Sequence, residues 1–93
     1  MPSYRRKPID LVLDVRSRLE FWLGHLDGAT CIPVGMLARV VPTRDDVTSN
    51  SRILVYCASG VRSAAAVQIL KSLGYRNVTN GGALSAARAD YSA

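Results

Sequence analysis

Cysteine and histidine are scarce in this sequence, which has two cysteines and one histidine. Cys31 and Cys57 are far apart in the chain, so the set of about four closely spaced ligands that a zinc ion needs is missing, and no metal is expected. A structural disulfide is not expected either, because Cys31 lies within one apolar segment and Cys57 follows another. Cys31 is interpreted as a small hydrophobic core residue. The alternative interpretation gives it a role in resolving an adduct on Cys57.

The chain also lacks any apolar run that approaches the roughly 20 residues needed to cross a bilayer. Its basic N-terminal residues, Met1–Lys7, are not followed by the apolar segment found in signal peptides. No membrane association is therefore expected, and the cytoplasm is the predicted location. Export is the alternative, if a leader has been removed ahead of Met1.

Aromatic residues make up only 6% of the chain, and the 7 acidic residues are outnumbered by 12 lysines and arginines. The resulting net charge of +5 is compatible with nucleic-acid binding. However, the basic residues are scattered apart from Arg5–Lys7 and do not alternate with aromatic ones. No nucleic-acid partner is therefore predicted, and the charge is interpreted as a solvated surface that would help to attract a small anion.

The 93 residues suffice for one domain with one modest core, so the whole chain, 1–93, is interpreted as a single domain. Short apolar runs alternate with helical patterns, which is typical of an α/β fold with a parallel sheet. Loose termini are expected outside a core of about residues 9 to 84, with Asp90–Ala93 as a loose end and Thr43–Ser51 as a surface connection. The expected elements are Ile9–Asp14, Arg18–Leu23, Ala29–Ile32, Met36–Val41, Ile53–Tyr56, Ser63–Leu73 and Asn77–Thr79.

Cys57 stands at the junction between a predicted buried strand and a predicted helix, which is a typical place for a nucleophile. Unpaired backbone N–H groups and the helix dipole favour a thiolate at a helix N-terminus. The pKa of such a cysteine lies below the usual value of roughly 8.5, so no histidine partner is required. Cys57 is therefore the predicted catalytic residue, in a loop that reads Cys57-Ala58-Ser59-Gly60-Val61-Arg62-Ser63.

The other residues of this loop are suited to holding an anion. Gly60 allows a tight backbone turn, and Arg62 supplies a forked cation for a sulfonate or a similar oxyanion. Ser63 is a candidate for a helix cap as much as for a catalytic role. The predicted substrate-binding residues are Arg62 and, chiefly through their backbone N–H groups, Ala58, Ser59, Gly60, Val61 and Ser63.

The loop resembles the active-site loop of rhodanese-type sulfurtransferases. Four residues separate Cys57 from Arg62, whereas cysteine phosphatases have five, so a phosphatase or an arsenate reductase is disfavoured. Two further segments are similar to signatures of the same family, and together they span roughly residues 9 to 84. They are Leu11-Val12-Leu13-Asp14-Val15-Arg16 with Glu20-Phe21, Gly24-His25-Leu26-Asp27-Gly28-Ala29 and Ile32-Pro33, and Leu73-Gly74-Tyr75 with Asn77-Val78 and Gly81-Gly82.

The resemblance implies a rhodanese-like fold, a small parallel sheet of four to five strands flanked by helices on both faces. It implies no cofactor, and a reaction in which Cys57 takes sulfane sulfur from thiosulfate or another small anionic donor as a persulfide. The acceptor would be cyanide or a thiol, such as glutathione or a thioredoxin-like protein. The alternative is a persulfide carrier or interaction module that receives sulfur from a partner protein, and exposed apolar residues around the loop would favour it.

Asp14 and Arg16 flank the end of the first predicted strand, and a structural role is expected for both, as an ion pair or as partners of nearby loops. Arg16 and Glu20 lie four residues apart and are a plausible local pair. His25 lies in a turn far in sequence from Cys57. The resemblance implies that it helps to hold this turn and is not a general base. Compared with longer family members, little sequence precedes Ile9, so a reduced sheet is expected.

Overall fold

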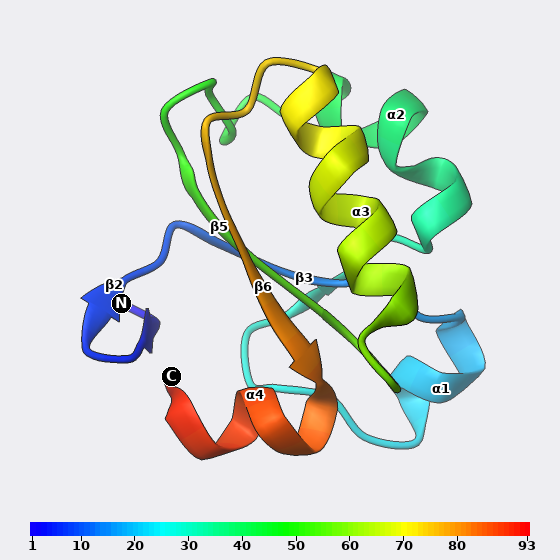
Figure 1. Cartoon of the computed structure of the whole chain (residues 1–93), viewed down its shortest axis with the longest axis vertical. Coiled ribbons are helices and arrows are strands. Elements are labelled where there is room, and N and C mark those ends of the chain that lie inside the picture. The colour runs from blue at the N-terminus through cyan, green and yellow to red at the C-terminus, as the bar shows by residue number, and fades with distance from the viewer.

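The computed structural model describes all 93 residues and is built on a four-stranded parallel sheet (Figure 1). The strand order is β4-β3-β5-β6, and every neighbouring pair is parallel. The expected α/β architecture with four to five strands is therefore confirmed. The strands are β3 (Leu11–Asp14), β4 (Thr30–Cys31), β5 (Arg52–Cys57) and β6 (Asn77–Ala83).

Helices cover both faces of this sheet. The long helix α3 and the short helix α2 pack on one face, and α4 packs on β5 and β6 from the other. Helix α1 lies at the carboxyl end of the sheet, beside the loop that follows β5 (Figure 1). None of the helices has the length and apolar content that crossing a membrane would need. The helices are α1 (Arg18–Trp22), α2 (Leu37–Val40), α3 (Val61–Ser72) and α4 (Leu84–Asp90), and the 3-10 turns Val34–Met36 and Val41–Thr43 flank α2.

The strands are buried on both sides, because alternate residues of a strand point to opposite faces. One face meets α2 and α3, where Leu13 and Val55 pack against Leu37 and Leu70. The other face meets α4 and the N-terminal segment through Val12, Leu54, Tyr56, Tyr4 and Ala87. Strand β5 is central to both layers and ends at Cys57, so the position of this residue is fixed by the core.

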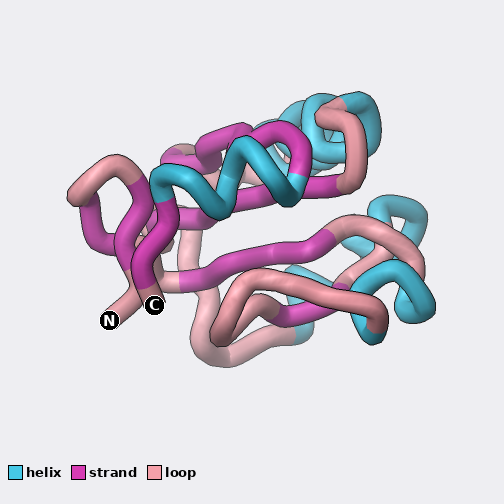
Figure 2. The backbone as a smooth tube through the Cα atoms, turned by 90° about the horizontal axis from the view of Figure 1, so that it is seen from below, coloured by secondary structure: helices cyan, strands magenta, loops and turns pink.

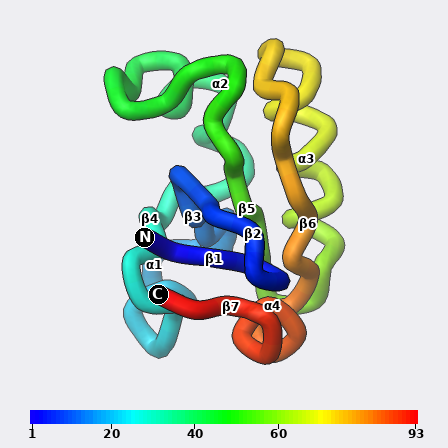
Figure 3. Tube along the Cα trace, turned by 90° about the vertical axis from the view of Figure 1, so that its left-hand side faces the viewer, coloured from blue at the N-terminus to red at the C-terminus, as the bar shows by residue number.

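The chain termini are ordered and lie together, contrary to the expectation of loose ends. Strand β1 (Ser3–Tyr4) pairs antiparallel with both β2 (Lys7–Pro8) and β7 (Tyr91–Ser92), so this small sheet joins the two ends of the chain (Figures 2 and 3). The sequence does not predict these strands, because two residues are too few to show the alternation of apolar and polar side chains that indicates a strand. The turn between β1 and β2 also lacks glycine, and Arg5 and Arg6 adopt its left-handed backbone, with φ of 51° and 66°.

Strand β6 is longer than the sequence indicated and contains a bulge. Val55 pairs with Asn80 and Tyr56 pairs with Gly82, so Gly81 is the extra residue. A Cβ atom on Gly81 would lie 3.1 Å from Leu54 Cδ1 and 3.2 Å from the Val55 oxygen, which explains the glycine. The bulge carries β6 on to Ala83, where it pairs with Cys57.

Candidate active site

Cys57 is the last residue of β5, and a short turn connects it to helix α3. Gly60 is the N-cap of this helix and has a φ of +95°, a conformation that favours glycine. The turn folds back on the cysteine, and the backbone N–H of Gly60 donates to Cys57 Sγ at 2.9 Å. Ser63 is the third residue of α3, so the expectation that it caps the helix is wrong. The helix starts two residues earlier because Gly60 can adopt the left-handed conformation.

The environment of Cys57 stabilises a thiolate. Burial by itself raises the pKa of the Cys57 thiol. Hydrogen bonds from the Ser63 hydroxyl and from the backbone N–H groups of Ser63, Gly60 and Ser59 outweigh this burial and leave the pKa below its usual value. The loop therefore stabilises the charge of a thiolate without a histidine.

Ser63 connects the sulfur to the turn. Its Oγ donates to the Gly60 carbonyl oxygen at 3.0 Å and lies 3.5 Å from Cys57 Sγ. A hydroxyl has a single proton, so with a neutral thiol Ser63 accepts from Sγ and donates to Gly60. When the thiol ionises, rotation of the hydroxyl allows it to donate to Sγ instead. Ser63 can therefore serve both protonation states of Cys57.

Cys57 itself has no exposed surface in this conformation. Ala58 and Ser59, which follow it in the turn, are exposed, as is Val61 at 74%. None of the cavities in the structure is lined by Cys57. A molecule that reacts with Sγ therefore reaches it only after a local movement of this turn.

Arg62 lies at the start of α3 and binds Glu20 of α1. Its two terminal nitrogens donate to the two Glu20 carboxylate oxygens at 2.7 and 2.9 Å. Arg62 is the main cause that lowers the pKa of Glu20 to about 2, and the backbone N–H of Ser17 adds to it. Glu20 thus connects the cysteine loop to α1. The expected local pair of Arg16 with Glu20 is wrong, because each finds a different partner.

Asp14 and Arg16 form a buried ion pair beneath the site. Arg16 donates from Nη2 to Asp14 Oδ2 at 2.6 Å and from Nε to both carboxylate oxygens. The same Nη2 donates to the Gly24 carbonyl oxygen at 2.6 Å, and the guanidinium lies 5.7 Å from the centre of the Tyr56 ring. The pair therefore connects β3 to the segment after α1 and lies next to Tyr56, which precedes Cys57.

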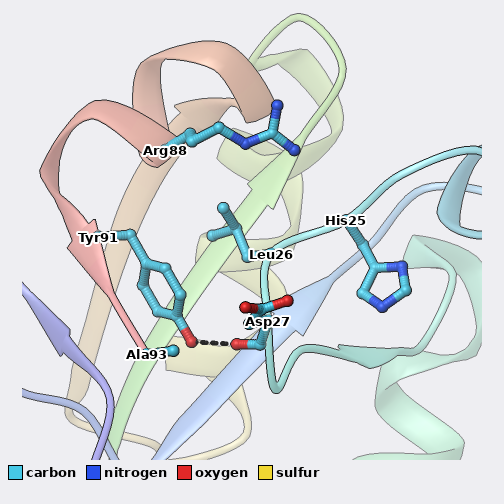
Figure 4. A pocket seen from close by; sticks show the side chains of 6 residues that line it. All are labelled: His25, Leu26, Asp27, Arg88, Tyr91 and Ala93. Atoms are coloured by element: carbon cyan, nitrogen blue, oxygen red, sulfur yellow. Dashed lines mark hydrogen bonds between the residues drawn. The ribbon is translucent and has the colours of Figure 1, made fainter.

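His25 lies in the turn after α1 and is exposed. Its ring stacks on Phe21 with ring centres 3.6 Å apart, and Nδ1 lies 2.8 Å from the Phe21 carbonyl oxygen. His25 also borders the largest cavity, of about 290 Å³ (Figure 4). At this cavity the Tyr91 hydroxyl of β7 donates to the Asp27 carbonyl oxygen, and Arg88 of α4 also lines it. Cys57 does not line this cavity, so the cavity is not part of the predicted site around Cys57.

Cys31 is too far from Cys57 to act on it directly. Cys31 lies on β4, which pairs with β3, and β3 in turn separates it from β5. Two strand spacings amount to about 10 Å, beyond the roughly 7 Å between Cα atoms that a disulfide spans. Both thiols are free, and burial raises the pKa of Cys31. No three histidine, cysteine or carboxylate side chains gather closely enough to hold a metal ion.

Comparison with known proteins places this geometry in a family. The model of the rhodanese-like domain matches residues 3–82. The chain belongs to the rhodanese-like family. Among its relatives is the thiosulfate sulfurtransferase PspE of Escherichia coli, which is 34% identical over 76 residues that cover 77% of this chain and 68% of PspE. The fold agrees, since a crystallised E. coli rhodanese with anions has a TM-score of 0.78 at 29% identity over 88% of this chain and 95% of its own.

Other relatives show that a rhodanese-like domain is used in larger proteins. The tRNA uridine(34) hydroxylase of Erwinia tasmaniensis is 30% identical over 86 residues, which cover 87% of this chain but only 25% of that protein. The chain spans between 25% and 68% of the length of five curated relatives that it matches. Family membership alone therefore leaves the reaction of this rhodanese-like chain to be argued from its own site.

The structure brings together most of the residues that the sequence singled out. The turn from Cys57 to Ser63 surrounds the sulfur, and the Asp14–Arg16 pair lies next to Tyr56. Sequence reasoning missed the contact of Glu20 with Arg62, which are 42 residues apart. The only signal for it was the position of Glu20 three residues after Ser17, a capping box that fixes the carboxylate at the start of α1.

Proposed function

We propose that this rhodanese-like domain is a sulfurtransferase that moves sulfane sulfur from thiosulfate or a similar donor to cyanide or a thiol through a Cys57 persulfide. The observation that carries the proposal is the direct contact of the Gly60 N–H with Cys57 Sγ at 2.9 Å, in a turn that lowers the pKa of the thiol. A thiolate is the nucleophile in such a reaction. The similarity to PspE, which is named a thiosulfate sulfurtransferase, supports the choice of donor.

The reaction consists of two displacements at sulfur. The Cys57 thiolate attacks the outer sulfur of thiosulfate, a new bond forms between the two sulfurs, and sulfite leaves with the electrons of the bond that breaks. The terminal sulfur of the persulfide carries the negative charge, which the backbone N–H groups of the turn stabilise. Cyanide or a thiolate then attacks this terminal sulfur, and Cys57 leaves as a thiolate.

Arg62 is proposed to bind the anionic end of the donor. Its guanidinium has five N–H groups, of which the contacts with Glu20 use two, so three are available to an anion. The side chain is 38% exposed and lies five residues after Cys57. Ala58, Ser59, Gly60, Val61 and Ser63 are proposed to complete this site, chiefly through their backbone.

Replacing Arg62 with glutamine is expected to raise the KM for thiosulfate by about tenfold or more, since a hydrogen bond to a charged group contributes about 1.5–3 kcal/mol. The matched variant is Glu20→Gln, which breaks the same ion pair but keeps the guanidinium. This variant is expected to change the KM by less than about threefold. Steady-state kinetics of thiocyanate formation measure both. Equal effects of the two substitutions would show that Arg62 only braces the loop.

The proposed function is tested by the intact mass of reduced protein after incubation with thiosulfate. The protein is expected to gain one sulfur atom, and addition of cyanide is expected to restore the original mass and release thiocyanate. A Cys31→Ser variant serves as a control and is expected to behave like the natural sequence, since β3 separates Cys31 from Cys57. Protein that remains unmodified at saturating thiosulfate would contradict the proposal for this donor.

A second candidate function is that of a persulfide carrier that receives sulfur from another protein. The observation that favours it is the exposure of apolar side chains in the cysteine loop and in the helix bound to it, namely Val61 at 74% and Trp22 of α1 at 78%. A small dianion has no use for such a surface. The two functions differ in kinetics, because a carrier would be loaded poorly by thiosulfate and rapidly by a protein persulfide.

A further inference from the structure

A groove lies at the opposite end of the sheet from Cys57, where the hairpin of β1 and β2 lies beside β6 (Figure 3). It consists of two adjoining cavities of about 220 and 190 Å³, which share Lys7, Ile9 and Thr79 as lining residues. Arg52 lines the larger cavity and is the first residue of β5, whereas Cys57 is the last. Roughly 16 Å of strand therefore separate the groove from the cysteine.

The charged residues that line this groove are all cations. Lys7, Arg52 and Arg76 line the larger cavity, Arg5 and Lys7 line the smaller one, and no aspartate or glutamate lines either. Lys7 and Arg76 are exposed and form no ion pair, so both charges are available to an anion. We name these two cavities together the basic groove.

The other two arginines of the basic groove keep free donors, although each binds a carboxylate that does not line the groove. Arg52 donates through Nε and Nη2 to Asp10 at 3.0 and 2.9 Å, and Arg5 donates through Nε to Asp90 at 3.2 Å. A guanidinium has five N–H groups, so three remain on Arg52 and four on Arg5. The carboxylates balance the charges of these two arginines, and Lys7 and Arg76 supply the excess positive charge.

The hairpin that borders the basic groove carries arginines at positions where its turn favours other residues. Arg5 and Arg6 connect β1 to β2 and have left-handed φ values of 51° and 66°. Asparagine and glycine are preferred in such two-residue turns, because larger side chains are strained in this conformation. Local folding therefore does not explain the basic run from Arg5 to Lys7, whereas an anion bound in the groove would explain it.

The chemistry and shape of the basic groove favour a chain of linked phosphates. Guanidinium groups bind phosphate oxygens in pairs, and lysine binds them as a point charge. A single small dianion would fill only part of the two adjoining cavities, whereas a phosphate chain is extended as the groove is. Nucleic-acid bases find no stacking surface, because Tyr4, the one aromatic lining residue, is 6% exposed and its ring centre lies 5.2 Å beneath the Arg5 guanidinium.

We propose that the basic groove binds a short chain of linked phosphate groups, either a free inorganic oligophosphate or the phosphate tail of a nucleotide. Lys7 and Arg76 neutralise the charge of the chain, and the free N–H groups of Arg5 and Arg52 bind its oxygens. The site uses neither Cys57 nor the cysteine loop. This inference is therefore independent of the proposed sulfur transfer, and a Cys57→Ser variant is expected to bind the chain as well as the original protein does.

Isothermal titration calorimetry with tripolyphosphate, in low salt and without a divalent metal, tests the proposal. Lys7→Gln and Arg76→Gln are each expected to raise the Kd by about fivefold or more, because each removes a charge-assisted contact that solvent only partly screens. The matched control is Arg18→Gln, which removes an exposed arginine without an ion pair from α1, at the carboxyl end of the sheet. This variant is expected to change the Kd by less than about twofold.

The remaining outcomes are equally clear. Equal losses in all three variants would show attraction by the net charge of +5 alone and would overturn the proposal, as would no binding at about 1 mM tripolyphosphate. Thiosulfate that binds as tightly as tripolyphosphate, or a short single-stranded RNA that binds more tightly and depends on Arg76, would also overturn it. Titration with ATP identifies the source: a Kd within about threefold of that for tripolyphosphate supports the chain alone, and a lower Kd supports a nucleotide.

Discussion

Replacing Cys57 with serine is expected to lower sulfur uptake from thiosulfate by more than about a thousandfold, because removal of a catalytic nucleophile costs at least this much in comparable enzymes. A serine hydroxyl does not ionise near neutral pH, and its oxygen cannot form a persulfide. The structure supports a clean experiment, since the Gly60 N–H that donates to Sγ can donate to a serine oxygen instead. Intact mass and thiocyanate release measure the loss.

The variant is informative only if it folds, and this can be checked independently. Serine is close to cysteine in size, and Cys57 lies at the end of β5, where its neighbour Ser63 already provides a polar contact. Circular dichroism and the midpoint of urea unfolding are expected to stay near those of the original protein. Residual sulfur uptake by the folded variant would move the nucleophile to Cys31 and would remove the basis of the proposed function.

Replacing Asp14 with alanine is expected to lower the free energy of unfolding by about 3–5 kcal/mol, the usual cost of leaving one partner of a buried ion pair alone. Asp14 is fully buried, and Arg16 has a side-chain exposure of only 8%. The total stability of a small domain is about 5–15 kcal/mol, so this loss is a large part of it. Urea titration with circular dichroism measures the change.

The chain contains a matched control for this substitution. Asp10 binds Arg52 through the same bidentate geometry, with distances of 2.9 and 3.0 Å, but at the surface, where the arginine side chain is 45% exposed. Asp10→Ala is expected to cost about 0–1 kcal/mol, because solvent screens the pair. If both substitutions cost the same, burial would not be the reason for the effect of Asp14→Ala.

Much of the fold could be predicted from the sequence because its strands are buried on both faces. Ile53–Tyr56 is a continuous apolar run, which is typical of a central parallel strand, and the structure extends it by one residue at each end. The helix after it was equally clear from Ser63–Leu73, although α3 begins at Val61. Glycine at position 60 takes a conformation that spacing alone does not reveal.

Long-range contacts between charged residues could not be predicted in the same way. The sequence offered Arg16 two partners, Asp14 two residues behind and Glu20 four residues ahead, and the structure confirms the pair with Asp14 but not the one with Glu20. The structure selects Asp14 because the end of β3 is extended and directs both side chains to the same buried place, where the charges must be paired. Glu20 is then available to Arg62, and the contact between them depends on the tertiary fold.

The small sheet of the termini was missed for another reason. Each of its strands has two residues, and β7 lies in a tail whose composition indicates a loose end. Its formation depends on Tyr4, which is buried against the second face of the main sheet, and on the pairing of residues 3 and 4 with residues 91 and 92. Order in this region is therefore a result of tertiary packing and not of local propensity.

The bulge at Gly81 bears on which residues of this domain can be substituted during evolution. The bulge places Gly82 next to Gly60, and the Cα of Gly82 lies 3.8 Å from where a Gly60 Cβ would be. At this point the cysteine loop therefore packs against backbone atoms. The side chains of Ala58, Ser59 and Val61 thus point to solvent and carry no packing duty. Under the proposed function, substitutions at these three positions are expected to alter the choice of donor or acceptor while the free energy of unfolding stays nearly constant. We therefore expect specificity and stability to be encoded by separate residues, so that each can evolve without the other.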